Sequence, residues 1–254
     1  MLTELLTLDV YRFFLVFARL GAALMVLPGF AGRLVSSRIR LLLGLSLSFL
    51  MLPLIGPTLP PLPKNISLLL LLLLGETTIG VFIGMVAQLL LSAINIAGTF
   101  IGFQTGLTNA FSFDPIAEQQ SQLLTGFLSN VALVLIFAAD LHHMMIRALI
   151  DSYAVFQPGQ ALPWGDFAET MAHTLTDAFR LGIQLSAPLV AFGLVFYTGL
   201  GVLSRLVPQM QVFFVSLPIQ VLVGLWLLMV SLPTIMLIFL RWFGDGLSAY
   251  TVPH

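Results

Sequence analysis

The longest apolar stretch of this chain runs from Ile66 to Phe103 and contains one charged residue, Glu76. A helix needs about 20 apolar residues to cross the hydrocarbon core of a bilayer, and this stretch is much longer. It predicts either one long helix that protrudes from the membrane or two shorter pieces. The whole chain of 254 residues is 59% hydrophobic and 8% charged, which is typical of a protein that crosses a membrane several times.

Six apolar runs can be separated along the chain, and several of them are interrupted by proline. They favour an all-α membrane-type protein built from kinked and broken helical hairpins. Lysine and arginine are distributed almost evenly between the two sides that six spans would define, so the positive-inside rule gives no orientation. We infer that not every run is a simple lipid-facing span. The runs are Val10–Phe30, Ile39–Ile55, Ile66–Phe103, Leu123–Ala139, Leu181–Leu203 and Val212–Phe243.

The composition excludes several kinds of chemistry. The chain has no cysteine, so it has no disulfide, no thiol nucleophile and no cysteine-bound zinc or iron–sulfur cluster. A net charge of −1 at pH 7 does not suggest binding to nucleic acid. His142 and His143 are adjacent, and neighbours on a regular helix point about 100° apart. We therefore expect no metal site and no cofactor.

Arg19 and Glu76 are charged residues that lie well inside apolar runs. Placing an arginine such as Arg19 at a bilayer centre costs about 2.5–3.5 kcal/mol, so we expect this side chain to face protein or water. Glu76 is followed at four-residue spacing by Gly80 and Gly84, a small-residue face suited to close helix contact. We interpret Glu76 as a packing residue and not a proton carrier, so Glu76→Gln should preserve the assembly and the function of the protein.

The segment from Gly98 to Gln122 differs from the runs around it. Gly98, Gly102 and Gly106 fall four residues apart, which predicts one helical face that another backbone can approach closely. On this basis Gly102→Leu should block assembly. The second half reads as a loop, because Asp114-Pro115 starts a turn and polar residues follow. The loop is either a surface connection or a re-entrant, pore-lining element, since irregular backbone at membrane depth survives only within protein or beside water.

Several short motifs carry a resemblance to a known family. The most specific is Ser204-Arg205-Leu206-Val207-Pro208-Gln209, and Gln211 departs from the asparagine common at that place. With these residues the chain resembles, over nearly its whole length, the FliR family, the export-gate subunit of flagellar type III secretion. The other supporting motifs are Arg19 before Leu27-Pro28-Gly29-Phe30, Glu76 with Gly80 and Gly84, Gly98-Thr99-Phe100-Ile101-Gly102, His142-His143 before Ser152-Tyr153, and Ala187-Pro188.

The resemblance implies a single integral membrane export-gate domain over residues 1–254. Its half of about 1–180 would be FliP-like and its half of about 181–254 FliQ-like, in a pseudo-helical assembly with FliP and FliQ. Further partners would be a FliB/FlhB-type switch protein, FlhA-type export proteins, unfolded flagellar substrates and membrane lipid, with no nucleic acid. The location would be the bacterial inner membrane, in the flagellar basal body, and the protein would not be an enzyme.

The resemblance also implies roles for individual residues. The loop from Leu107 to Gln122 would be the internal plug of the export path, with gate residues Leu107, Phe111, Phe113, Asp114 and Pro115. The buried polar or inter-subunit residues would be Arg19, Glu76, Arg205 and Gln209. The helix-packing residues would be Gly80, Gly84, Gly98, Gly102 and Gly106.

Two other functions compete with a role in protein export. A small-solute transporter would explain Glu76, the broken helices and the glycine faces, although no inverted repeat is visible between the halves. An intramembrane protease would need Ser46 or Ser48 together with His142 or His143, but no nucleophile motif surrounds either serine.

Overall fold

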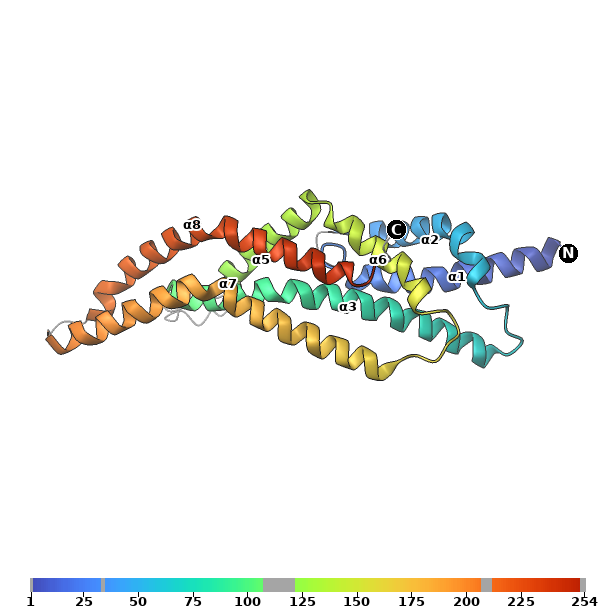
Figure 1. The fold of residues 1–254 in the computed structure, drawn as a ribbon. Coiled ribbons are helices and arrows are strands. Elements are labelled where there is room, and N and C mark those ends of the chain that lie inside the picture. Colours follow the sequence, from blue (N-terminus) through green and yellow to red (C-terminus); the bar gives the residue numbers. More distant parts are fainter. Residues whose placement is uncertain (1, 33–34, 107–121, 207–211, 252–254) are drawn as a thin grey trace. The chain divides into compact units, whose positions relative to one another are not determined.

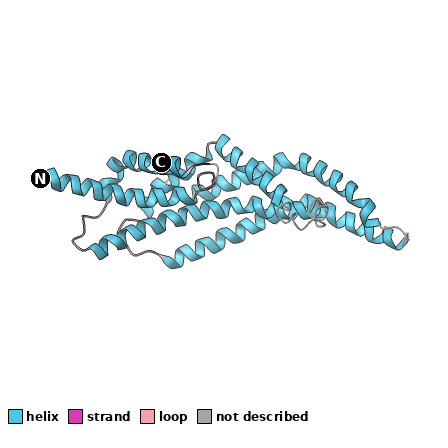
Figure 2. Cartoon of the chain, turned by 180° about the vertical axis from the view of Figure 1, so that it is seen from behind, coloured by secondary structure: helices cyan, strands magenta, loops and turns pink. Residues whose placement is uncertain are grey.

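The computed structural model describes residues 2–32, 35–106, 122–206 and 212–251, and every regular element in these ranges is a helix (Figure 1, Figure 2). The all-α fold predicted from the sequence is thereby confirmed for the described residues. The elements are α1 (Leu2–Val26), α2 (Ser37–Ile55), the short 3₁₀ helix η1 (Gly56–Thr58), α3 (Ile66–Gln104), α5 (Gln122–Ala138), α6 (Leu141–Val155), α7 (Trp164–Leu206) and α8 (Val212–Ser248).

Four helical segments are long and apolar enough to cross a membrane, namely Ser37–Thr58, Ile66–Gln104, Trp164–Leu206 and Ser216–Ser248. The pair α5 and α6 would supply a fifth span if the two helices are counted together as one broken span. Helix α1, which carries Asp9, Arg12 and Arg19, is not among them. The described chain therefore has four or five candidate spans, fewer than its six apolar runs.

The long apolar stretch that begins at Ile66 forms one helix and not two shorter pieces. The 39 residues of α3 are continuous. The helix ends where Gly106 adopts a left-handed conformation with φ of 72°. A glycine in this conformation is a common helix stop, since it has no Cβ to clash with the backbone. Gly106 thus lies beyond the end of the helix, and only Gly98 and Gly102 share the helical face expected for all three glycines.

The prolines of the last two runs lie inside continuous helices. Pro188 is within α7, and Pro218 and Pro233 are within α8, which curves along its length in Figure 1. A proline removes one backbone hydrogen bond and bends a helix, but it need not end one when neighbouring contacts compensate. The helical break lies instead between α5 and α6, at Ala139 and Asp140.

The chain divides into two compact units, each assembled from separate parts of the sequence. Unit 1 comprises Met1–Leu90, Asp140–Thr174 and Gly244–His254, and unit 2 comprises Leu91–Ala139 and Leu175–Phe243. The long helices α3, α7 and α8 each contribute to both units.

The core of unit 1 is formed by one face of α1 packed with residues of α3, α6 and the start of α7. Buried positions on α1 recur at the three- and four-residue spacing of a helix face, at Val16, Leu20 and Ala23. An aromatic cluster completes this core, in which the rings of Phe82 and Phe167 stack with centroids 4.0 Å apart. These contacts fix the part of α3 that carries Glu76.

The core of unit 2 depends on close approach of helices at small residues. A Cβ added at Gly98 would lie 2.9 Å from the Cα of Thr125 on α5. A Cβ at Gly182 on α7 would lie 2.6 Å from Ile96 on α3. Both contacts are closer than real Cβ atoms tolerate, so glycine is needed for these helices to pack.

Candidate functional site

Arg19 is the centre of a buried polar cluster in unit 1, and its side chain is fully buried. Its Nε donates a hydrogen bond to Oε2 of Glu76 at 2.7 Å. Its Nη1 donates to Oγ of Ser152 at 3.1 Å, and its Nη2 donates to the carbonyl oxygen of Phe156 at 2.9 Å. One guanidinium thereby joins α1, α3 and the end of α6 through charge-assisted hydrogen bonds.

Two tyrosines border this cluster. The guanidinium of Arg19 lies 3.8 Å from the ring centroid of Tyr153, a cation–π contact in a buried setting. The hydroxyl of Tyr11 on α1 is buried and has no hydrogen-bond partner among the described residues. Burial raises the pKa of Tyr11, and the negative charge of Glu76 raises it further, so this phenol stays neutral.

The backbone of α1 reaches α3 at the glycines that follow Glu76. A Cβ at Gly80 would overlap the carbonyl oxygen of Arg19, and one at Gly84 would lie 2.8 Å from the Cβ of Val26. The small-residue face is therefore the surface on which α1 crosses α3. Because the ion pair and this crossing involve the same two helices, each holds the other in position.

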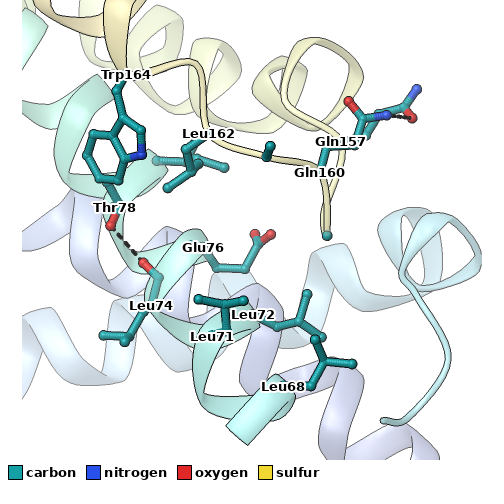
Figure 3. A pocket seen from close by; sticks show the side chains of 14 residues that line it. Leu68, Leu71, Leu72, Leu74, Glu76, Thr78, Gln157, Gln160, Leu162 and Trp164 are labelled. Atoms are coloured by element: carbon teal, nitrogen blue, oxygen red, sulfur yellow. Dashed lines mark hydrogen bonds between the residues drawn. The ribbon is translucent and has the colours of Figure 1, made fainter.

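A cavity of about 660 Å³ lies beside this cluster in unit 1 (Figure 3). One wall is the leucine-rich start of α3, including Leu68, Leu71 and Leu72, and the other is the connection 157–164 between α6 and α7. Figure 3 shows the carboxylate of Glu76 directed toward that connection. Since Glu76 is bound to Arg19 and 1% exposed, the cavity is mainly an apolar recess.

Unit 2 contains a second, uncharged polar cluster at the end of α3. Gln220 of α8 is 4% exposed, and its Nε2 donates to the carbonyl oxygen of Gln104 and to the hydroxyl oxygen of Tyr197, both at 3.0 Å. These bonds join α3, α7 and α8. Gly106 packs on the same amide, because a Cβ there would lie 2.8 Å from Cδ of Gln220. The point where the chain leaves α3 is therefore fixed by Gln220.

Several residues singled out from the sequence lie outside the described residues. These are the gate residues Leu107, Phe111, Phe113, Asp114 and Pro115, and the polar residue Gln209. Among the described ones, Arg205 is exposed in the last turn of α7 and has no ion-pair partner there. Gly102 is buried in α3. The structure thus brings Arg19 and Glu76 together in unit 1, whereas Arg205 belongs to unit 2.

The residues of the protease alternative do not form a catalytic arrangement. The hydroxyl of Ser48 donates to the carbonyl oxygen of Gly44 one helical turn away, and Ser46 is exposed on the same helix. A serine nucleophile needs a base within hydrogen-bond reach, and neither serine has a hydrogen bond to histidine in the described part of the chain.

Comparison with known proteins gives the family. Residues 10–246 match the family described as bacterial export proteins, family 1. The chain belongs to the FliR family of flagellar export proteins. It is 37% identical over 243 residues to the flagellar biosynthetic protein FliR of Caulobacter vibrioides, covering 96% of this chain and 97% of that one.

More distant FliR proteins match over similar lengths. The FliR protein of Bacillus subtilis is 31% identical over 229 residues, covering 89% of this chain and 88% of that one. The FliR protein of Escherichia coli is 29% identical over 221 residues, covering 85% and 82%. This FliR-family chain is accordingly a membrane-embedded component of flagellar protein export and not an enzyme.

Sequence reasoning missed most of the partners in both clusters. Ser152 and Tyr153 were noted only as part of a motif, and Gln220 was not singled out. The available signal for Gln220 was a lone amide in an apolar run, two residues after Pro218, since polar groups within such runs are rare and need partners. No sequence pattern predicts the hydrogen bond from Arg19 to the backbone of Phe156, because every residue has a backbone carbonyl group.

Proposed function

We propose that this chain is a structural subunit of the flagellar type III export gate in the bacterial inner membrane, forming with FliP and FliQ the channel for unfolded flagellar substrates. The single observation that supports it most is the family match over residues 10–246. FlhB-type and FlhA-type export proteins are the further partners of this proposal, with a FliP-like half of about 1–180 and a FliQ-like half of about 181–254.

The buried ion pair supports a structural role over a transport cycle. A carboxylate that carries protons or binds a cation must be accessible and must change partners. Glu76 is 1% exposed and bonded to the permanently charged Arg19, which itself is held by Ser152 and Phe156. The geometry of this site therefore favours a static structural role over the function of a small-solute transporter.

The segment Leu107–Gln122 is the plug of the export path in this proposal, and its phenylalanines form the seal. The chain enters this segment from Gly106, which Gln220 holds in unit 2. A segment that seals a pore needs a fixed starting point, and apolar rings at a constriction exclude water and ions. Leu107, Phe111, Phe113, Asp114 and Pro115 are the proposed gate residues.

The experiment is a double substitution, Phe111→Ala/Phe113→Ala, in cells that lack the wild-type chain. The expected result is a complex that assembles but leaks ions or dye, because the apolar rings of the seal are gone. Membrane conductance or dye entry is measured beside complex assembly on native gels. Phe127→Ala, at an exposed phenylalanine of α5, is the matched control and should not leak. An assembled double variant as tight as wild type would reject the plug.

The proposed partners have a separate test. The chain is purified from its native membrane with a small tag, and the accompanying proteins are identified by mass spectrometry. Recovery of the FliP and FliQ proteins in fixed proportion is the expected result. Recovery of the chain alone, from mild detergent in which the flagellar apparatus stays intact, would contradict the gate assembly and would favour an independent transporter.

A further inference from the structure

Three potential metal ligands meet at the break between α5 and α6. Asp140 precedes the first residue of α6, and His142 and His143 lie in its first turn. One donor atom from each of the three side chains lies within 4.8 Å of the other two. The Nδ1 atom of His143 is 3.5 Å from Oδ1 of Asp140, and the imidazole centroids of His142 and His143 are 4.0 Å apart.

The backbone at Asp140 is in an uncommon conformation. Its φ of 58° is left-handed, and it is the one residue other than glycine with positive φ in the described part of the chain. Aspartate adopts this conformation at a free-energy cost, although more readily than most residues. Its carboxylate stands at the N-terminal cap position of α6 but makes no capping hydrogen bond. The carboxylate lies against the imidazole of His143 and is not used to cap the helix.

The two histidines lie closer together than the regular helix geometry suggested. Helical side chains lean toward the helix N-terminus. Because His142 and His143 lie in the first turn of α6, their imidazoles have no earlier turn of that helix to lie against. The two imidazoles can therefore turn toward one another beyond the helix end, where Asp140 also lies. The expectation that neighbouring histidines point apart applies within a helix and not at its first turn.

We propose that Asp140, His142 and His143 form a binding site for a divalent first-row transition metal ion, with zinc as the natural occupant. Two imidazoles and one carboxylate are ligands that zinc accepts, with solvent completing the coordination. A tetrahedral zinc ion with bonds of about 2.0–2.1 Å separates its ligands by about 3.4 Å. The pair of Asp140 and His143 already has this spacing.

Two of the three ligands are largely exposed to solvent. The side chains of His143 and Asp140 are 70% and 78% exposed, so both can move and an ion can reach them. The positive end of a helix disfavours a cation, and the carboxylate of Asp140 compensates by supplying a negative charge at the same place. Ca²⁺ and Mg²⁺ are not expected to bind well, because they prefer oxygen ligands.

A second pair in the same unit serves as a matched control. His173 and Glu169 lie one turn apart on α7, with Nε2 and Oε1 3.6 Å apart and both side chains exposed. This pair has the same chemistry as His143 with Asp140, but no third ligand joins it in the described residues. If Asp140 and His143 formed only an exposed histidine–carboxylate contact, this pair and the pair of Glu169 and His173 would bind metal equally.

The test uses the full chain, purified in detergent with the subunits that accompany it and without a histidine tag. Co²⁺ serves as a coloured probe, followed by its visible absorption, and Zn²⁺ displaces it. Wild type should bind one Co²⁺ more per chain than Asp140→Asn or His143→Asn, and affinity should fall by about tenfold or more in each variant. Asn at position 140 tolerates the left-handed backbone, so the fold is preserved, as checked by circular dichroism.

His173→Asn should bind Co²⁺ as wild type does. Any metal sites on accompanying subunits are the same in all preparations and cancel in this comparison. The proposal is overturned if wild type shows no saturable binding, or if His143→Asn binds as tightly as wild type. Equal loss in His173→Asn and His143→Asn would also overturn it, because it would indicate surface binding without a defined site.

Discussion

The Nε atom of Arg19 on α1 lies 2.7 Å from Oε2 of Glu76 on α3, 57 residues later in the chain, and both side chains are buried. A buried charge is tolerated because its partner neutralises it and further hydrogen bonds satisfy the remaining donors. Nη1 and Nη2 of Arg19 each donate one further bond, to Ser152 and Phe156. Removing either charge therefore does more than remove one contact.

Glu76→Gln is expected to lower the amount of stably folded chain. The amide keeps the shape of glutamate but leaves the charge of Arg19 buried without a counter-charge, and breaking such a pair costs about 3–5 kcal/mol. The ion pair thus reverses the expectation from sequence that this substitution is tolerated. Chain level in the membrane and thermal aggregation of the purified protein measure the effect.

The double substitution Arg19→Met/Glu76→Met provides the control. Replacing a whole buried pair with apolar residues costs less than removing one charge, so the double variant should be more stable than Glu76→Gln. If Glu76→Gln alone is as stable as wild type, the pair does not hold α1 and α3 together.

Gly80→Ala should be strongly destabilising, whereas Gly75→Ala on the same helix should not. A methyl group at position 80 overlaps the backbone carbonyl of Arg19, which cannot move without shifting α1. No atom lies within 4 Å of the corresponding position at Gly75, and alanine favours helix. Flagellar motility on soft agar and chain level should fall for the first variant and stay normal for the second. Equal behaviour would argue against the close crossing.

Gly106→Ala is expected to destabilise the end of α3. Alanine in the left-handed conformation costs about 1–2 kcal/mol, and its methyl group would also meet the amide of Gln220 at 2.8 Å. Gly126→Ala on α5 is the control, because no atom lies within 4 Å there. Limited proteolysis after residue 106 reports the effect, and an unchanged cleavage rate in Gly106→Ala would contradict it.

Gln220→Leu should loosen the contact between α8 and the end of α3. The substitution leaves the carbonyl oxygen of Gln104 and the hydroxyl of Tyr197 without this donor, which costs about 1–3 kcal/mol for buried polar groups. Gln184→Leu on the exposed side of α7 should have no effect. Limited proteolysis at the end of α3 measures the effect, and cleavage should become faster only for Gln220→Leu.

The sequence was sufficient for features that depend on local pattern. The apolar character of Ile66–Phe103 predicts either one long helix or two shorter pieces, and the first of these is observed as α3. The spacing of Glu76, Gly80 and Gly84 defines one face of this helix. The sequence could not say that Arg19 meets Glu76, because that pairing depends on the angle and register at which α1 crosses α3. Several polar residues elsewhere in the chain would have been equally reasonable partners.

The ends and breaks of helices were harder to predict than their existence. Pro218 and Pro233 predict a last run that is bent or interrupted, and α8 is curved but continues through both, because packing and neighbouring groups outweigh a single lost hydrogen bond. Gly106 was placed on a helix face, although a glycine after the last apolar residue is also the usual stop signal. The uncharged cluster around Gln220 involves residues 104, 197 and 220, and local pattern does not connect such distant positions.

The two polar clusters differ in charge, and this difference decides how easily the helices that each cluster joins can slide past one another. Sliding α1 along α3 by one helical turn moves their side chains by about 5.4 Å, which would leave both Arg19 and Glu76 as isolated charges. The ion pair therefore allows only one register of α1 on α3. Gln220 is neutral, and an amide can exchange one oxygen partner for another at small cost. Charge thus locks the register of α1 on α3, whereas neutral hydrogen bonds alone hold the end of α3 against α7 and α8.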